Sequence, residues 1–231
     1  MTTKSKKHKI YELKFSNWFF DCIVALDGNL PLNKLIKSLG SIPILAADGA
    51  AISLFKKNIK VDYVIGDLDT FWSSPLSSSF EKEKIIHLPS QEVNDFEKTL
   101  NFADSLNYKN LLIIGFHGGE LEHTLNNWSV LKKYLRKLNL CLLDRNRYGI
   151  PLSKSCSFYA FQNEMISLIP QPKARLSTVN LKWKLTNETL ELGTREGARN
   201  IAISEKVTIK IHSGELLLFL DSRMPFAPEF T

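Results

Sequence analysis

The chain has 231 residues, 44% hydrophobic and 23% charged, which is an ordinary globular composition for one large domain or two smaller ones. Its formal net charge of +6 includes a basic start, so we interpret the excess as a solvated tail and surface and expect no nucleic-acid partner. No apolar run approaches the roughly 20 residues of a membrane helix, and three scattered cysteines are typical of free thiols, so we expect a cytoplasmic protein with no membrane contact.

Short apolar runs alternate with helical spacing through the first part of the chain. We predict strands over residues 19–26, 42–47, 61–65, 85–88, 110–114 and 140–144. We predict helices over residues 31–39, 50–57, 94–106 and 121–138. This alternation predicts a parallel sheet with helices on both faces, in which ligands bind beyond the carboxyl ends of the strands.

Helical spacing disappears after about Tyr148. Turn residues then separate strand-like runs at residues 157–161, 165–169, 179–183, 207–211 and 216–220. We therefore predict an α/β domain over residues 1–148 and an all-β domain over residues 149–231. We expect residues 225–231 to be a loose tail.

Two carboxylates follow the predicted strand at 61–65, in the sequence Gly66-Asp67-Leu68-Asp69. On extended backbone, side chains at positions i and i+2 point to the same face, so we expect Asp67 and Asp69 to lie together beyond the sheet. Two neighbouring anions repel each other unless a cation or a proton lies between them. Carboxylate oxygens suit Mg²⁺, which usually arrives with substrate phosphates.

Two further acids, Asp48 and Asp95, lie at a strand end and at a helix start. Each by itself is more typical of a helix N-cap than of a binding site. Because the carboxyl ends of parallel strands meet at one edge, the combination of acids predicts a metal site there. Lys98, one turn into its helix, either reaches a phosphate or is a solvated surface lysine.

A glycine-containing loop, residues 115–120, joins a predicted strand to a predicted helix, where backbone N–H groups can bind phosphates. It is not a Walker A loop, because no Lys-Ser/Thr follows the glycines. His117 and His123 are six residues apart, a spacing that does not place them on one helix face, so we interpret them as ordinary loop and helix-start residues. Lysines flank Trp183, while Leu181 and Leu185 share its face of the predicted strand, which by itself favours a core position.

Five motifs, in this order, resemble the thiamine pyrophosphokinase family over about residues 20–220. They are Asp48-Gly49-Ala50-Ala51, Gly66-Asp67-Leu68-Asp69-Thr70, Gln91-Glu92-Val93-Asn94-Asp95, Gly118-Gly119-Glu120-Leu121-Glu122-His123 and Asn180-Leu181-Lys182-Trp183-Lys184-Leu185. The fourth departs from the family pattern, because Glu120 and Glu122 stand where the family has an arginine and an aspartate.

The resemblance implies a parallel-sheet α/β ATP-binding catalytic domain followed by an all-β sandwich domain that binds thiamine and makes a homodimer. It implies Mg²⁺-dependent transfer of the pyrophosphoryl group of ATP to the thiamine hydroxyl, giving thiamine diphosphate and AMP, in an active site shared by two subunits. By resemblance, Mg²⁺ would bind Asp67, Asp69 and Asp95, while Asp48 would complete the metal shell or orient the attacking hydroxyl.

The same resemblance assigns residues to the two substrates. ATP would contact Gln91, Asn94, Lys98, Gly118, Gly119 and His123. Thiamine would contact Trp183, stacked against its cationic ring, and Asn200. Two alternatives stay open: a pyrophosphokinase for another hydroxymethyl heterocycle such as a pterin, and a catalytically degenerate nucleotide- or thiamine-binding protein.

Overall fold

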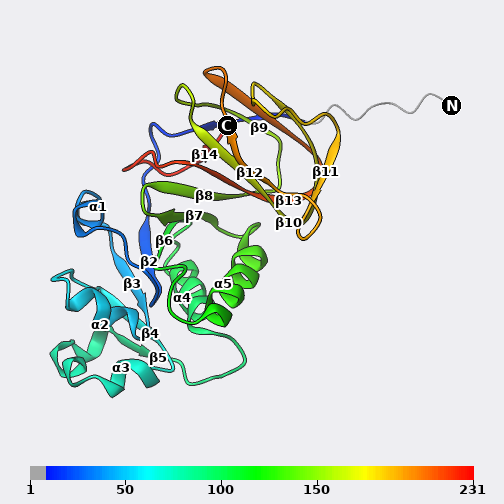
Figure 1. Ribbon diagram of the computed structural model, residues 1–231. Helices are drawn as coiled ribbons and strands as arrows, with labels where there is room; N and C mark the ends of the chain where they lie inside the picture. The colour runs from blue at the N-terminus through cyan, green and yellow to red at the C-terminus, as the bar shows by residue number, and fades with distance from the viewer. Residues whose placement is uncertain (1–8) are drawn as a thin grey trace. The chain divides into compact units, whose positions relative to one another are not determined.

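The computed structural model describes residues 9–231, so the basic residues Lys4, Lys6 and Lys7 lie outside the described part. Contacts divide the chain into two compact units, and Figure 1 shows its elements. The α/β unit comprises Asn17–Arg147 and Ser222–Ala227. The β-rich unit comprises the described residues up to Ser16, then Tyr148–Asp221 and Pro228–Thr231. Neither unit is therefore one continuous stretch of the chain.

The α/β unit is built on a six-stranded sheet with the order β7-β6-β2-β3-β4-β5. Every neighbouring pair in it is parallel, as predicted. All residues of β2 and β3 are buried, as expected for a parallel sheet covered on both faces. The strands are β2 (Cys22–Ala25), β3 (Ile44–Ala47), β4 (Tyr63–Gly66), β5 (Ile85–His87), β6 (Asn110–Ile114) and β7 (Asn139–Asp144).

Helices flank this sheet, with α1 and α2 on one side of the strands and α4 and α5 on the other in Figure 1. They are α1 (Asn33–Lys37), α2 (Ala50–Phe55), α3 (Asp69–Ser73), α4 (Asp95–Ser105) and α5 (Leu121–Tyr134), with two short 3₁₀ turns, η1 (Pro75–Ser79) and η2 (Lys82–Lys84). The four predicted helices are confirmed, although α5 ends at Tyr134 rather than at residue 138. No helix within residues 9–231 is both long enough and apolar enough to cross a membrane.

The β-rich unit is organised around two long antiparallel strands, β10 and β13. β10 also pairs with β11 and β12, while β9 pairs antiparallel with β13 and parallel with β1. The strands are β1 (Tyr11–Lys14), β8 (Arg147–Leu152), β9 (Cys156–Tyr159), β10 (Met165–Val179), β11 (Glu188–Glu191), β12 (Gly197–Ile201), β13 (Lys206–Asp221) and β14 (Glu229–Phe230). An α/β unit followed by a β-rich unit is the predicted fold class.

Three details of the predicted strands are wrong. The runs at 207–211 and 216–220 form one strand, β13. The run at 179–183 is not a strand, because β10 ends at Val179 and Leu181 makes only an isolated bridge to Ala202. Residues 225–231 are not a loose tail, since Ala227 is fully buried and β14 pairs with β1. That pairing joins the two ends of the described chain, so no local pattern predicts it.

Candidate active site

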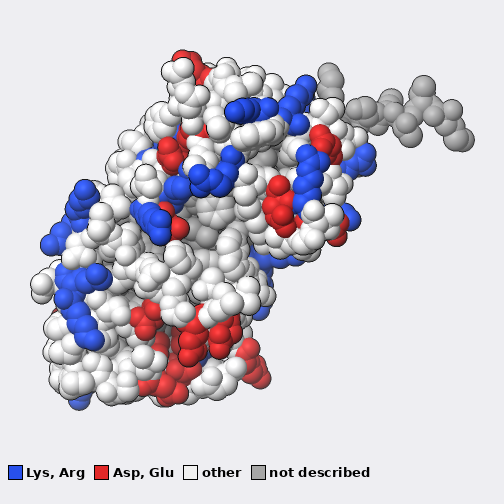
Figure 2. Space-filling view, viewed as in Figure 1, with Lys and Arg blue, Asp and Glu red and all other residues white. Residues whose placement is uncertain are grey.

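A cleft of about 670 Å³ opens at the carboxyl edge of the parallel sheet. It is lined by the loops that follow β2, β3, β4 and β6, by the segment that enters α4, and by the first half of α5. All the Asp, Glu, Lys and Arg side chains among its described lining residues are acidic: Asp27, Asp48, Asp67, Glu92, Asp95, Glu97 and Glu120. Figure 2 shows acidic side chains gathered over the α/β unit, in the lower part of the view.

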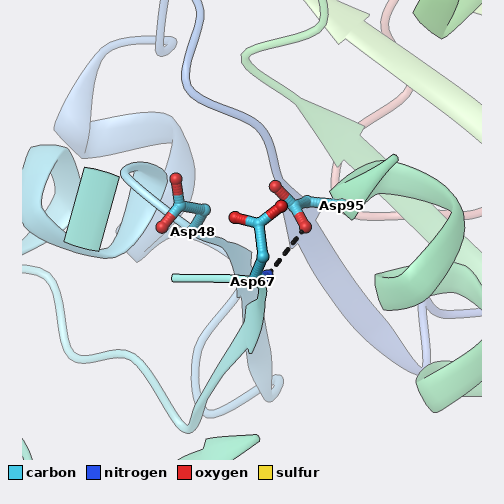
Figure 3. A group of neighbouring side chains, drawn as sticks. All are labelled: Asp48, Asp67 and Asp95. Carbon is cyan, nitrogen blue, oxygen red and sulfur yellow. Dashed lines mark hydrogen bonds between the residues drawn. The ribbon is translucent and has the colours of Figure 1, made fainter. Parts of the chain in front are cut away.

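Three carboxylates meet inside this cleft (Figure 3). Asp48 follows β3, Asp67 follows β4 and Asp95 opens α4, and one oxygen atom from each lies within 4.8 Å of the others. The close approach requires Gly66, because a Cβ atom there would lie 2.9 Å from Asp95 Oδ1. The parallel sheet and the short turn after β4 therefore bring the three side chains together.

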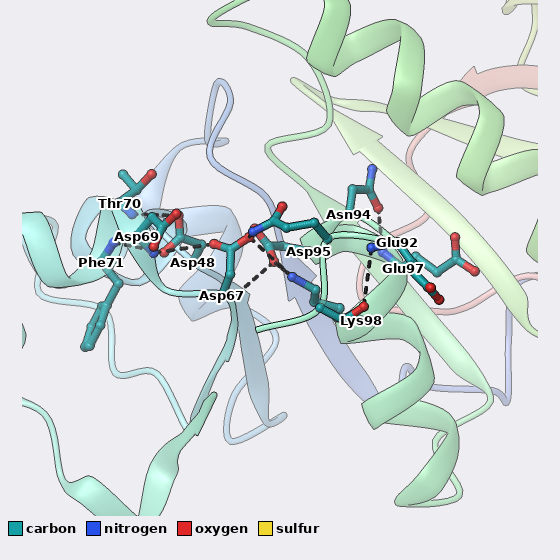
Figure 4. Close-up of polar contacts among 12 residues, drawn as sticks. Asp48, Asp67, Asp69, Thr70, Phe71, Glu92, Asn94, Asp95, Glu97 and Lys98 are labelled. Atoms are coloured by element: carbon teal, nitrogen blue, oxygen red, sulfur yellow. Dashed lines mark hydrogen bonds and ion pairs between the residues drawn. The ribbon is translucent and has the colours of Figure 1, made fainter. Parts of the chain in front are cut away.

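Asp48 is a cap, but not of the helix that follows it. Its carboxylate accepts hydrogen bonds from the backbone N–H groups of Phe71 (2.8 Å) and Thr70 (3.2 Å), at the first turn of α3 (Figure 4). No side chain caps α2, the next helix along the chain. The side chain of Asp48 is thus held in place by α3 while it lines the cleft.

Asp95 is not the N-cap of α4, so the capping interpretation is wrong for this residue. The cap is Asn94, whose Oδ1 accepts a hydrogen bond of 2.9 Å from Glu97 N. Asp95 Oδ1 instead accepts hydrogen bonds from Asp67 N (3.1 Å) and from Lys98 Nζ (2.9 Å). Asn94 lines the cleft, but its side-chain carbonyl oxygen already accepts the capping hydrogen bond.

Lys98 is not a solvated helix lysine, because its side chain is only 3% exposed. Its ammonium group contacts Asp95 Oδ1 at 2.9 Å and Asp67 Oδ2 at 3.4 Å (Figure 4). Burial alone would lower the pKa of Lys98, but the hydrogen bond and charge of Asp95, together with Asp67, raise it above its usual value. Lys98 therefore remains a cation beside the carboxylates.

The pKa values of the two carboxylates that Lys98 contacts move in opposite directions. Burial is the largest influence on Asp95 and raises its pKa, and the contact with Lys98 offsets this only in part. Burial also acts to raise the pKa of Asp67, but hydrogen bonds from the Asp69 backbone, from Gln91 and from Lys98 outweigh it and lower the pKa. Gln91 Nε2 donates that bond to Asp67 Oδ2 at 3.0 Å.

Asp69 is not among the three clustered carboxylates. The expectation that Asp67 and Asp69 share one face of extended backbone is wrong, because Leu68 is left-handed (φ 68°) and Asp69 begins α3. The backbone N–H of Asp69 points back to Asp67 Oδ1 at 3.4 Å. The cluster contains Asp48 in the place that the resemblance assigned to Asp69, and measurement of Mg²⁺ binding by the Asp48→Asn and Asp69→Asn variants decides between the two as ligands.

The donor set fits a divalent cation. Three carboxylates and one ammonium group leave two uncompensated negative charges, the charge that one Mg²⁺ neutralises. Carboxylate oxygens are the ligands that Mg²⁺ prefers, and one oxygen of each side chain lies within 4.8 Å of the others. A hard cation with oxygen ligands therefore matches this cluster.

The other residues assigned to ATP also lie at the cleft. Gly118, Gly119 and His123 line it, and His123 Nε2 lies 3.2 Å from Glu120 Oε2 in an exposed contact. The glycines have left-handed backbones, with φ values of 109° and 68°. Glu120, where the resemblance has an arginine, thus faces an imidazole in the free protein.

Sequence reasoning missed Asp27, which follows β2 and lines the cleft. Its Oδ1 accepts a hydrogen bond of 2.8 Å from Ser53 Oγ on α2. The signal was the same as for Asp48, an acid just after a buried strand and just before a glycine. Asn126 and Asn127 of α5 also line the cleft and were not predicted.

The two residues assigned to thiamine lie in the β-rich unit and contact each other. Trp183 is 55% exposed, so the core interpretation is wrong, and Lys182 Nζ lies 5.0 Å from its ring centre. Asn200 is only 5% exposed. Its amide accepts a hydrogen bond from Trp183 N (3.0 Å) and donates one to Trp183 O (2.8 Å). Asn200 therefore holds the backbone that presents Trp183.

Similarity to known proteins covers both units. Residues 38–142 match the family described as "Thiamin pyrophosphokinase, catalytic domain", and residues 150–216 match "Thiamin pyrophosphokinase, vitamin B1 binding domain". The chain is 24% identical over 185 residues to Thiamin pyrophosphokinase 1 of Caenorhabditis elegans, covering 73% of this chain and 75% of that protein.

Solved structures share the fold. Yeast thiamin pyrophosphokinase superposes with a TM-score of 0.72 at 14% identity, covering 96% of this chain and 94% of the yeast chain. The thiamin pyrophosphokinase of Geobacillus thermodenitrificans gives a TM-score of 0.72 at 18% identity, covering 87% and 97%. At these identities the likeness shows that the folds are the same.

Proposed function

The chain belongs to the thiamin pyrophosphokinase family, and we propose that the acidic cleft of its α/β unit is where ATP and Mg²⁺ bind for the family's reaction. As a member, it is a thiamine diphosphokinase, a transferase of thiamine diphosphate biosynthesis that uses ATP as co-substrate and thiamine as acceptor. The observation that carries the proposal is the convergence of Asp48, Asp67 and Asp95 within the cleft. Neither the pterin acceptor nor a degenerate binder is favoured by the similarities above.

In this proposal, Mg²⁺ is held by Asp48, Asp67 and Asp95, and when bound it neutralises charge on the phosphates of ATP. Lys98 holds Asp95 and Asp67 in place and supplies a fixed positive charge. Gln91 orients Asp67 through its hydrogen bond. The backbone N–H groups of Gly118 and Gly119, which also line the cleft, would donate hydrogen bonds to phosphate oxygens.

The test is ATP-dependent formation of thiamine diphosphate, followed together with release of AMP. We expect Asp67→Asn to lower kcat by roughly two orders of magnitude or more, because it removes a charge from the cluster while keeping the side-chain volume. Glu83→Gln, an exposed acid in the 3₁₀ turn η2, is the matched control and should behave as wild type. Full activity of Asp67→Asn would refute the assignment of the cleft.

We propose that thiamine binds against the exposed ring of Trp183, with an aromatic face toward its cationic ring. Tyr159, Phe161 and Ile203 of the same unit are also exposed, at 57% or more, which supports an association surface. The proposed assembly is a homodimer in which the β-rich unit of one subunit completes the cleft of the other.

Mixing two inactive variants tests this assembly. Asp67→Asn and Trp183→Ala chains, unfolded and refolded together, should regain about a quarter of wild-type activity, because half of the dimers are mixed and each carries one intact site. The same chains refolded separately are the control. No recovery, with dimers verified by light scattering, would place both residues in sites within one subunit.

A cytoplasmic location also stays a proposal. It is supported by the three cysteines, Cys22, Cys141 and Cys156, which are all free and buried. Burial raises the pKa of the Cys141 thiol well above its usual value, so it is kept protonated and unreactive.

A further inference from the structure

The glycine loop after β6 is attached to the loop after β2 through backbone contacts. Gly28 N donates a hydrogen bond to Gly115 O (3.0 Å), and Asn29 N donates one to His117 O (2.7 Å). The two loops lie so close that a Cβ atom at Gly28 would be 2.3 Å from His117 O. One side of the glycine loop is therefore attached to the segment that follows β2.

The other side is attached through the side chain of His117. Its Nε2 lies 2.9 Å from Asp144 Oδ1, at the carboxyl end of β7. The two side chains are 41% and 48% exposed. Because β7 and β2 are the two neighbours of β6 in the sheet, His117 connects the loop to the end of β7 and to the segment that follows β2.

Ordering this loop costs conformational entropy, because it is rich in glycine. Gly115, Gly118 and Gly119 all have left-handed backbones, and glycine has the largest backbone freedom to lose on ordering. Gly118 and Gly119 line the cleft, whereas His117 and Asp144 are not among its lining residues. Any influence of His117 and Asp144 on a ligand therefore passes through the backbone of the loop.

We propose that His117 and Asp144 are a positioning pair that holds the backbone N–H groups of Gly118 and Gly119 where the phosphates of ATP bind. The proposal rests on the proposed function, since it assigns these glycines to ATP. An exposed pair is sufficient for this role. Such a pair contributes up to about 1 kcal/mol, which corresponds to a roughly fivefold change in the affinity for ATP. The affinity for ATP depends on the pair, and the affinity for thiamine does not.

Steady-state kinetics separate this role from general destabilisation. His117→Ala and Asp144→Ala should each raise KM for ATP by about fivefold, with kcat and KM for thiamine changed less than ~2-fold. Asp144→Asn keeps an oxygen acceptor for the histidine and should restore KM for ATP. The double variant should be no worse than either single one. Asp104→Ala is the matched control, because it removes a similarly exposed contact, with Lys109, at the opposite end of β6.

Hydrogen exchange gives a readout that does not depend on catalysis. In His117→Ala, the amides of residues 115–119 should exchange faster than in wild type, while those of β3 and β4 do not change. If the wild type is active and both alanine variants have an unchanged KM for ATP, the positioning role of His117 and Asp144 is refuted. Unchanged exchange at residues 115–119 would overturn it as well. A wild type that forms no thiamine diphosphate would instead refute the proposed function, and the exchange result would still decide whether the pair holds the loop.

Discussion

Replacing Asn200 by alanine tests whether this residue contacts thiamine directly or acts through Trp183. The Asn200 amide is 5% exposed and makes three hydrogen bonds. Its Oδ1 accepts from Trp183 N at 3.0 Å and from Ile201 N at 2.9 Å, and its Nδ2 donates to Trp183 O at 2.8 Å. Because both ends of the amide are occupied by backbone, we expect Asn200 to position Trp183.

The expected effects follow from those three bonds. Each is worth about 1 kcal/mol net, so Asn200→Ala should lower the free energy of unfolding by about 3 kcal/mol. Release of the Trp183 backbone should raise KM for thiamine about tenfold, which corresponds to ~1.4 kcal/mol. KM for ATP should not change, since the cluster of carboxylates is in the other unit.

Urea unfolding and steady-state kinetics measure these quantities, and a double-mutant cycle decides between the two roles. In a Trp183→Ala background, adding Asn200→Ala should change KM for thiamine less than ~2-fold, because the residue through which it acts is gone. Ser155→Ala is the matched control. Ser155 Oγ is also buried and hydrogen-bonded to backbone, that of Ile211, in the same unit. It should lose stability with KM for thiamine unchanged.

Two results would refute this reasoning. An equal rise in KM for thiamine on adding Asn200→Ala with and without Trp183 would show that Asn200 acts independently of the tryptophan. A free energy of unfolding that does not fall in Asn200→Ala would show that its hydrogen bonds do not stabilise the unit.

Two other predictions concern the α/β unit. Calorimetric titration should show that Asp48→Asn weakens the affinity for Mg²⁺ by about tenfold or more. Asp69→Asn should change this affinity less than ~3-fold. The reverse order would make Asp69 the ligand. Burial, and then the charge of Glu97, raises the pKa of Tyr134 to about 12. The unfolded phenol ionises near pH 10, so the free energy of unfolding should fall between about pH 10 and pH 12, by about 2 kcal/mol more than in Tyr134→Phe. Parallel curves for the two proteins would contradict the buried phenol.

Local sequence patterns were sufficient to predict an element where it buries one stripe or one run of apolar residues. The strand at 110–114 was predicted to the residue, and α4 within one residue at each end, because its cap and its apolar spacing lie close together in the sequence. The patterns were insufficient where distant parts pair. β1 and β14 stabilise each other across almost the whole chain, and the short helix α3 depends on a cap from Asp48, 21 residues before its first residue.

For the site, the acids were found because they follow buried strands, and parallel strands end at one edge. The choice among them was partly wrong. The period of two that placed Asp69 beside Asp67 holds only on extended backbone, and Leu68 is left-handed. The environment of Lys98 could not be predicted either, because its side chain is buried where two carboxylates, Asp95 of α4 and Asp67 just after β4, come together in space.

The alternation of strands and helices, the change to β structure near residue 148 and the acidic edge can all be read from the amino-acid order, since each depends on apolar period and on residues next to a strand end. Which acids converge, which helix Asp48 caps and how Asn200 holds Trp183 emerge only from the folded chain. These contacts depend on folding because the partners of a side chain are set by the backbone of other elements. A hydrogen bond between segments distant in sequence, such as that from Phe71 N to Asp48, produces no periodic pattern in the sequence around either residue.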